Sequence, residues 1–134
     1  LEEEINHLNL YLGLEQVRFG HRLQIERKVQ EECLSEKLPS LLIQPLIENA
    51  IKYGLYGTIG DLVIELTCKL EQNRLRIEVR NLFEEGSSDI GGTGFGLPSI
   101  KRRLYLIYGR TDLLQTRIEN GIFIAQLIIP KSHV

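Results

Sequence analysis

The feature that most constrains this 134-residue chain is a largely apolar stretch at residues 41–57, with the sequence LLIQPLIENAIKYGLYG. At about 3.6 residues per turn, its aliphatic side chains fall on one side of a helix. The polar side chains gather on the other side: Glu48, Asn49, Lys52 and Tyr53. Pro45 lies near the expected start at residues 39–40, where a missing N–H costs little, and glycines at 54 and 57 are typical of a helix end. The pattern predicts a helix that packs on a core and presents a polar edge.

The polar edge of this helix has two interpretations. The ordinary one is a solvated face. The other is a ligand site, because a carboxylate, an amide oxygen and an ammonium lie within one turn. Mg²⁺ prefers oxygen ligands and is often held by few protein groups together with substrate phosphates. The edge therefore raises the hypothesis of a nucleotide site.

Length and composition indicate one globular domain, with 43% hydrophobic and 25% charged residues. The net charge of -2 provides no general attraction to nucleic acid, so we expect no nucleic-acid partner. No apolar run approaches the roughly 20 residues of a membrane helix. Cys33 and Cys68 lack CxxC spacing and are expected to be reduced and without zinc. The chain begins without methionine, which suggests a fragment whose upstream part, including any membrane segment, is not seen.

Periodicity along the chain predicts an α/β two-layer sandwich, with helices on one face of a mixed, mostly antiparallel sheet. Helices are predicted at 1–19, within 41–57 and at 97–108, and strands at 23–29, 62–70, 74–79, 113–119 and 122–129. The first helix is expected to bury Leu1, Ile5, Leu8, Leu12 and Val17. The third is expected to bury Leu97, Ile100, Leu104 and Ile107 and to end at Gly109. Turns are predicted at 71–73 and at Asn120-Gly121.

The strand at 74–79 continues its core-facing parity to Asn81, which predicts an amide on the core side just where the chain becomes irregular. An acidic loop with Gly and Ser follows at 82–93, and loops of this length are more often functional than idle. Residues 91–96, GGTGFG, precede a predicted helix, where backbone N–H groups suit a phosphate. The run is neither a P-loop nor a dinucleotide fingerprint, and a flexible linker is the alternative. Nearby basic side chains could assist a phosphate, but for each we favour exposure to solvent: Lys101, Arg102 and Arg103.

Two of these segments together resemble the N box and the second glycine box of the GHKL ATPases: 48–54 (ENAIKYG) and 92–97 (GTGFGL). The run 41–52, with Tyr11-Leu12 and Arg18-Phe19-Gly20 before it and Arg103-Leu104 and Tyr108-Gly109 after it, more closely resembles the LytS-type sensor histidine kinases. The resemblance spans almost the whole chain in order. It implies a Bergerat-type fold, in which residues 1–20 link from a missing dimerisation and phosphoacceptor region and residues 21–134 form the ATP-binding catalytic domain.

The resemblance also implies ATP and Mg²⁺ as cofactors. It assigns Asn49 as the Mg²⁺ ligand, Glu48 as the catalytic polar group near the γ-phosphate and Lys52 as a basic residue near the phosphates. The other implied nucleotide-binding residues are Tyr53, Asn81, Gly92, Gly94, Phe95, Gly96 and Leu97. Asn81 stands where the family usually has the Asp that accepts a hydrogen bond from the adenine amino group, and an Asn oxygen can accept the same bond without a charge. Leu82-Phe83 replace the usual Asn-Gly, and Tyr53 stands where His is common.

The reaction implied by the resemblance is transfer of the ATP γ-phosphoryl group to a His on upstream helices of the same or a partner protomer. A LytTR-type response regulator would then accept it from a homodimeric full-length kinase, and this chain would be a cytoplasmic domain of an inner-membrane parent. None of the histidines has the family's Pro-His-Phe context: His7, His21 and His133. The chain alone is therefore expected to bind nucleotide without phosphorylating itself.

Two alternatives to the kinase remain open. A degenerate nucleotide-binding or docking module is favoured by the altered residues 81–83 and opposed by Glu48, Asn49 and the glycines. A GHKL ATPase of another branch would use Glu48 as a general base towards water.

Overall fold

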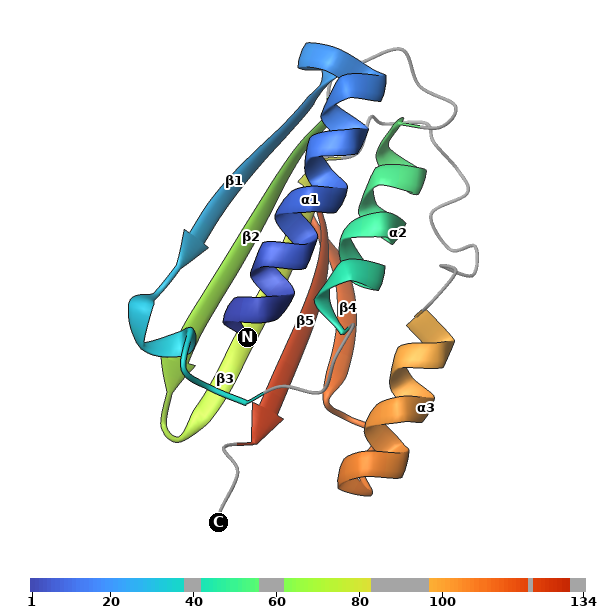
Figure 1. The fold of residues 1–134 in the computed structure, drawn as a ribbon. Helices are drawn as coiled ribbons and strands as arrows, with labels where there is room; N and C mark the ends of the chain where they lie inside the picture. Colours follow the sequence, from blue (N-terminus) through green and yellow to red (C-terminus); the bar gives the residue numbers. More distant parts are fainter. Residues whose placement is uncertain (38–41, 56–61, 83–96, 121, 131–134) are drawn as a thin grey trace.

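The computed structural model describes residues 1–37, 42–55, 62–82, 97–120 and 122–130 (Figure 1). Its elements are α1 (Glu2–Phe19), the 3₁₀ turn η1 (Gly20–Arg22), β1 (Leu23–Val29), the 3₁₀ turn η2 (Glu31–Cys33), α2 (Ile43–Leu55), β2 (Leu62–Glu71), β3 (Arg74–Leu82), α3 (Leu97–Tyr108), β4 (Leu114–Glu119) and β5 (Ile122–Pro130). The strands form one sheet in the order β1-β2-β3-β5-β4. The β1 and β2 strands are parallel, and the other neighbours are antiparallel. The helices lie on one side of this sheet, so the predicted mixed two-layer sandwich is confirmed (Figure 1).

The core lies between the sheet and the helices because the central strands alternate strictly. On β2 the residues that face the helices are at most 1% exposed: Leu62, Ile64, Leu66 and Cys68. On β3, Ile77 and Val79 lie opposite Cys68 and Leu66 and are equally buried. Full burial of one such aliphatic side chain contributes roughly 1.5–3 kcal/mol, so these strands supply a large part of the stabilisation.

The two predicted hairpin turns occur where expected. Between β2 and β3, Gln72 and Asn73 have φ of 48° and 63°, and positive φ at both central residues is characteristic of a type I′ turn. This geometry matches the right-handed twist of the flanking strands. Between β4 and β5, Asn120 has φ of 51°, and Gly121 lies outside the described residues.

Helix α1 packs on the same core as the sheet, through a stripe at intervals of four residues. Leu8 and Leu12 have no exposed surface, and Glu4 is 9% exposed. The prediction that Val17 shares this face is wrong, because Val17 is 86% exposed. Five residues beyond Leu12 correspond to a rotation of about 140° about the helix axis, which carries Val17 away from the core. The division of the chain at residue 20 stays a prediction.

Helix α3 packs beside α2 and ends as predicted. Ile100 and Leu104 are buried, whereas Ile107 is 51% exposed, so the expectation for Ile107 is wrong. The side of α3 that contacts the core continues instead to Tyr108, which is partly buried. Gly109 has φ of +72°, and its N–H donates to the Tyr105 oxygen at 2.8 Å. A left-handed glycine at this position is a common helix stop. None of the helices in the described ranges is both long and apolar enough to cross a bilayer.

Candidate nucleotide site

The site begins with α2, whose amphipathic pattern is confirmed. Its apolar side, formed by Leu46, Ile47, Ala50 and Ile51, is at most 2% exposed. The helix packs against β2, β3 and α3. Pro45 is the third residue of the helix, in the first turn, where its missing N–H leaves no intrahelical bond unmade.

Two neighbouring residues on α2 have opposite environments. Glu48 is exposed, and its Oε1 accepts a hydrogen bond from Gln44 Nε2 at 3.0 Å. Asn49 is 5% exposed, and its Oδ1 has no hydrogen-bond partner among the residues that the structure describes. An unpartnered buried carbonyl costs roughly 1–3 kcal/mol, and a ligand that coordinates this oxygen would offset the loss. A neutral amide oxygen is also a ligand type that Mg²⁺ accepts, so Asn49 fits the predicted metal.

Asn81, near the end of β3, is also a buried amide, and here both side-chain polar atoms lack a hydrogen-bond partner among the described residues. It lies opposite Ile64 on β2 and Phe123 on β5, on the face that the helices cover. It is 2% exposed, and within the described part of the chain neither its Oδ1 nor its Nδ2 has a partner. A buried amide that offers both an acceptor and a donor suits a ligand edge with the opposite pair, as adenine has in its amino group and ring nitrogens. The prediction that the Asn81 side chain faces the core is therefore confirmed.

The structure describes the side chains of some of the remaining predicted residues and not those of others. Lys52 is partly buried and interacts with other groups of the protein, and Leu97 is the first residue of α3 and packs against the core. Tyr53 lies in α2, but the predicted role of its side chain lies outside what the structure describes. The same holds for the predicted phosphate-binding segment: Gly92, Gly94, Phe95 and Gly96. Lys101 and Arg102 are exposed on α3, as favoured above, and Arg103 is partly buried.

One residue beside this helix escaped the sequence analysis. Glu4 belongs to the acidic first turn of α1, which by itself predicts an exposed carboxylate at a helix N-terminus. Instead its Oε1 accepts a hydrogen bond of 2.6 Å from the backbone N–H of Ile43, the first residue of α2. The spacing of residues 4, 8 and 12 was the available signal, because it places Glu4 on the buried stripe of α1.

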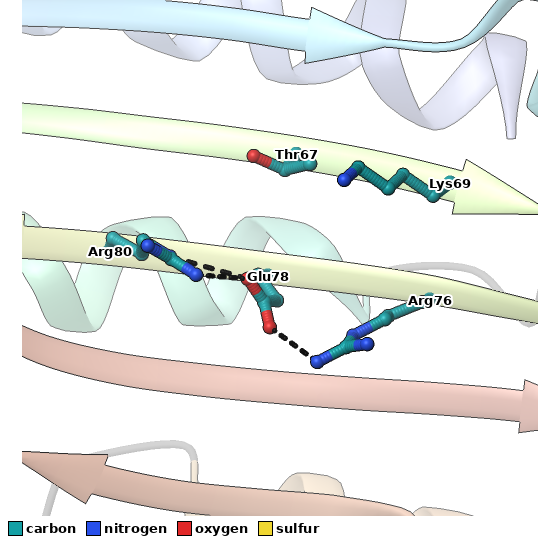
Figure 2. A pocket seen from close by; sticks show the side chains of 5 residues that line it. All are labelled: Thr67, Lys69, Arg76, Glu78 and Arg80. Atoms are coloured by element: carbon teal, nitrogen blue, oxygen red, sulfur yellow. Dashed lines mark hydrogen bonds and ion pairs between the residues drawn. The ribbon is translucent and has the colours of Figure 1, made fainter.

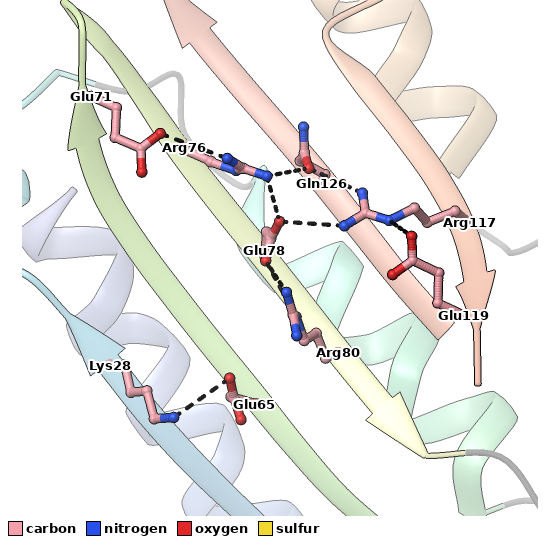
Figure 3. Close-up of polar contacts among 9 residues, drawn as sticks. All are labelled: Lys28, Glu65, Glu71, Arg76, Glu78, Arg80, Arg117, Glu119 and Gln126. Atoms are coloured by element: carbon pink, nitrogen blue, oxygen red, sulfur yellow. Dashed lines mark hydrogen bonds and ion pairs between the residues drawn. The ribbon is translucent and has the colours of Figure 1, made fainter. Parts of the chain in front are cut away.

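The opposite face of the sheet carries a second polar group of residues, which surrounds a shallow hollow of about 130 Å³ (Figure 2). Its lining residues are Thr67, Lys69, Arg76, Glu78 and Arg80. Glu78 is the centre of the group. It binds Arg80 Nη2 at 2.9 Å and Arg76 Nη2 at 3.1 Å, and Arg117 Nη2 lies 3.8 Å from it (Figure 3).

This second group is explained by the protein's own contacts. Gln126 Oε1 accepts from Arg76 at 3.0 Å and from Arg117 at 3.1 Å, so these guanidinium groups are already engaged. Burial raises the pKa of Glu78, but hydrogen bonds and charge from Arg80 and then Arg76 outweigh it, and the net pKa is lowered. Nearby Ile124, which pairs with Arg80, is only 2% exposed. The network therefore stabilises the outer face of the sheet.

Comparison with solved structures identifies the fold. The catalytic domain of the histidine kinase ThkA superimposes with a TM-score of 0.71, covering 98% of this chain and 94% of that domain at 15% identity. The Acinetobacter baumannii histidine kinase AdeS matches with a TM-score of 0.59, covering 97% of this chain and 66% of that protein at 13% identity. The chain thus has the fold of a histidine kinase catalytic domain.

Sequence comparison names the relatives. Sensor histidine kinase YpdA of Escherichia coli (strain K12) is 33% identical over 134 residues, covering 93% of this chain and 23% of the relative. Sensor protein LytS of Enterococcus faecalis is 31% identical, covering 97% of this chain and 24% of the relative. No protein-family model matches. The chain is homologous to the LytS-type sensor histidine kinases, as the run 41–52 and its flanking segments predicted, and spans about a quarter of the length of these relatives.

Proposed function

We propose that this chain is the ATP-binding catalytic domain of a two-component sensor histidine kinase. The observation that carries the proposal is a pair of buried amides, Asn49 on α2 and Asn81 on β3, whose polar atoms have no partner in the described part of a histidine kinase fold. Helix α2 packs against β3, so the two amides come from contacting elements. Unpartnered buried polar atoms are retained against a cost in stability, and ligand binding is a reason to retain them.

The residues at the polar edge of α2 would act on the phosphates. Asn49 Oδ1 would hold Mg²⁺, with phosphate oxygens and water completing the coordination. When bound, Mg²⁺ neutralises charge that develops on the transferred phosphoryl group. Glu48 lies one residue earlier on the exposed side, where it would accept hydrogen bonds near the γ-phosphate, and Lys52 would add a positive charge one turn later. The glycines at 92, 94 and 96 would present backbone N–H groups to the phosphates.

Asn81 would recognise the base. Its oxygen would accept a hydrogen bond from the adenine amino group, and its nitrogen would donate to a ring nitrogen. Hydrogen bonds to a neutral acceptor are weaker than those to a carboxylate. We therefore expect weaker adenine binding than an Asp at this position would provide.

The reaction would be transfer of the γ-phosphoryl group to a His outside this chain, on helices upstream of α1, and then to a LytTR-type response regulator. Positioning and charge stabilisation are the protein's main contributions to phosphoryl transfer, and few side chains are needed for them. ThkA, one of the structural neighbours, has been crystallised in complex with the response regulator TrrA. A homodimeric full-length protein anchored in the inner membrane completes the proposal.

Titration calorimetry of the 134-residue chain with ADP, with and without Mg²⁺, tests the proposal. Mg²⁺-dependent binding is expected, and Asn49→Ala should weaken it by about tenfold or more, since a metal ligand is lost. Asn9→Ala is the matched control, because Asn9 is an exposed asparagine on α1. Absence of binding at millimolar ADP would overturn the proposal in favour of a docking module. Steady ATP hydrolysis by the isolated chain would instead indicate an ATPase of another GHKL branch.

A further inference from the structure

Glu4 is a charged residue in the middle of an apolar interface. It lies on the α1 stripe with Leu8 and Leu12, whose side chains have no exposed surface, and it is itself 9% exposed. A buried carboxylate is strongly disfavoured unless it is hydrogen-bonded. Its Oε1 meets this need through the Ile43 N–H at 2.6 Å, whereas its Oε2 has no partner within the described ranges. The carboxylate therefore depends on α2 for its place in the core.

The first turn of α2 in turn depends on Glu4. The first backbone N–H groups of a helix have no partner inside the helix, and the helix dipole places partial positive charge there. Burial raises the pKa of Glu4, and the backbone N–H groups of Ile43, Leu42 and Gln44 oppose this shift. Ile43 and Gln44 belong to the first turn of α2, and Leu42 directly precedes it. Glu4 thus acts as the capping residue of a helix that is 39 residues away in sequence.

The same turn connects Glu4 with the polar edge of the candidate site. Ile43 donates its N–H to Glu4 at 2.6 Å, and the next residue, Gln44, donates through its side-chain Nε2 to Glu48 Oε1 at 3.0 Å. Two consecutive residues of α2 therefore lie between the carboxylate from α1 and the proposed catalytic carboxylate. This contact provides a short physical route between the two helices.

The orientation of α2 about its axis decides which polar residue enters the core. Glu48 is exposed and Asn49 is 5% exposed, and neighbouring residues of a helix differ by about 100° of rotation. Asn49 lies about 9 Å along the axis from Ile43, within the same rigid segment. A fixed contact at Ile43 therefore restrains the direction in which Asn49 and Glu48 point.

We propose that Glu4 is a positioning residue of the candidate nucleotide site, through which the placement of α1 sets the orientation of the helix that carries Glu48 and Asn49. The inference rests on the proposed function, because it concerns regulation of that same site. Any movement of α1 that withdraws the Glu4 carboxylate would release the first turn of α2 and weaken nucleotide binding. Helix α1 would then act as the element that communicates with the rest of a longer protein.

The test compares Glu4→Ala, Glu4→Gln and the control Glu3→Ala, which removes an exposed carboxylate from the same turn of α1. Each variant of the 134-residue chain is titrated with Mg²⁺-ADP by calorimetry, and amide shifts along α2 are recorded by ¹⁵N NMR. Glu4→Ala should weaken ADP binding by about fivefold to tenfold, because binding would have to restore the first turn of α2 at a free-energy cost like that of a lost cap. Its shift changes should extend to Glu48 and Asn49. Glu4→Gln, which keeps an acceptor for Ile43, should retain most of the affinity, and Glu3→Ala should retain all of it.

Binding by Glu4→Ala equal to that of the parent chain, or shift changes that stop at the first turn of α2, would overturn the inference. If Glu4→Ala does not fold, Glu4→Asp replaces it, because a carboxylate one methylene shorter keeps the charge and loses the reach to Ile43. A parent chain that binds no ADP would overturn the proposed function. That result differs from equal ADP binding by the parent chain and Glu4→Ala, which would overturn only the role of Glu4.

Discussion

Asn81 allows a prediction in which stability and ligand binding change in opposite directions. Its side chain is 2% exposed, and neither polar atom has a partner among the described residues. Each unpartnered buried group costs roughly 1–3 kcal/mol, and replacement by an apolar side chain of similar size removes that cost. Asn81→Leu places such a side chain between Ile64 and Phe123. After some loss from imperfect packing, we expect the free energy of unfolding to rise by about 1–3 kcal/mol, or roughly 3–10 °C in Tm.

The same substitution should remove the contacts with adenine. Urea unfolding followed by circular dichroism measures the stability, and calorimetric titration with ADP and GDP measures affinity and base preference. Loss of the paired donor and acceptor should weaken ADP binding by about tenfold or more and reduce any preference over GDP. Asn81→Asp is the informative companion. It buries a charge and should lower the stability of the free domain, while its carboxylate should tighten adenine binding.

The exposed substitution Asn6→Leu on α1 serves as the control and should change neither quantity. A loss of stability in Asn81→Leu, together with unchanged ADP binding, would refute the reasoning. That result would show that the Asn81 amide is already satisfied within the protein and has no role in recognising the base.

Two further predictions concern buried ionisable groups. Glu78→Gln should lower the free energy of unfolding at pH 7 by about 1–2 kcal/mol, a modest value because Arg76 and Arg80 are 38–40% exposed. Since the pKa of Glu78 is lowered from 4.5, this stabilisation is present above that value and disappears as the pH falls through the folded-state pKa. Urea unfolding in a series of buffers from pH 7 down to a pH below the folded-state value measures the loss. A difference that persists undiminished in acid would contradict the assignment. Burial, then Cys33 and Glu4, raise the pKa of Cys68 to about 12, so its thiol should react with a disulfide reagent at pH 8 only as the domain opens. Rapid labelling of Cys68 in the folded chain would contradict this prediction.

Several features of the fold follow from local sequence because their physical causes are local. The alternation on β2 and β3, the Gln72-Asn73 turn and the stop at Gly109 depend on residues within one or two positions of each other. The amphipathic pattern of α2 predicts both its helical state and its buried side. The motifs at 48–54 and 92–97, with the run 41–52 and its flanking segments, predict a resemblance to sensor histidine kinases, and the homologous sensor kinases confirm it. These features can be predicted from the sequence because each depends only on residues that are close together in the chain.

Only the tertiary structure decides which polar residues enter the core. Periodicity alone leaves Glu4 in an acidic first turn and places Asn49 on the polar side of α2, yet both are nearly inaccessible to water. The order β1-β2-β3-β5-β4, with β1 parallel at the edge, brings together strands that are far apart in the chain. Burial of a side chain depends on everything that packs around it, and here that includes α1 meeting the start of α2. Local pattern therefore determined the elements and the family, whereas the packing of distant elements decided the environment of each functional group.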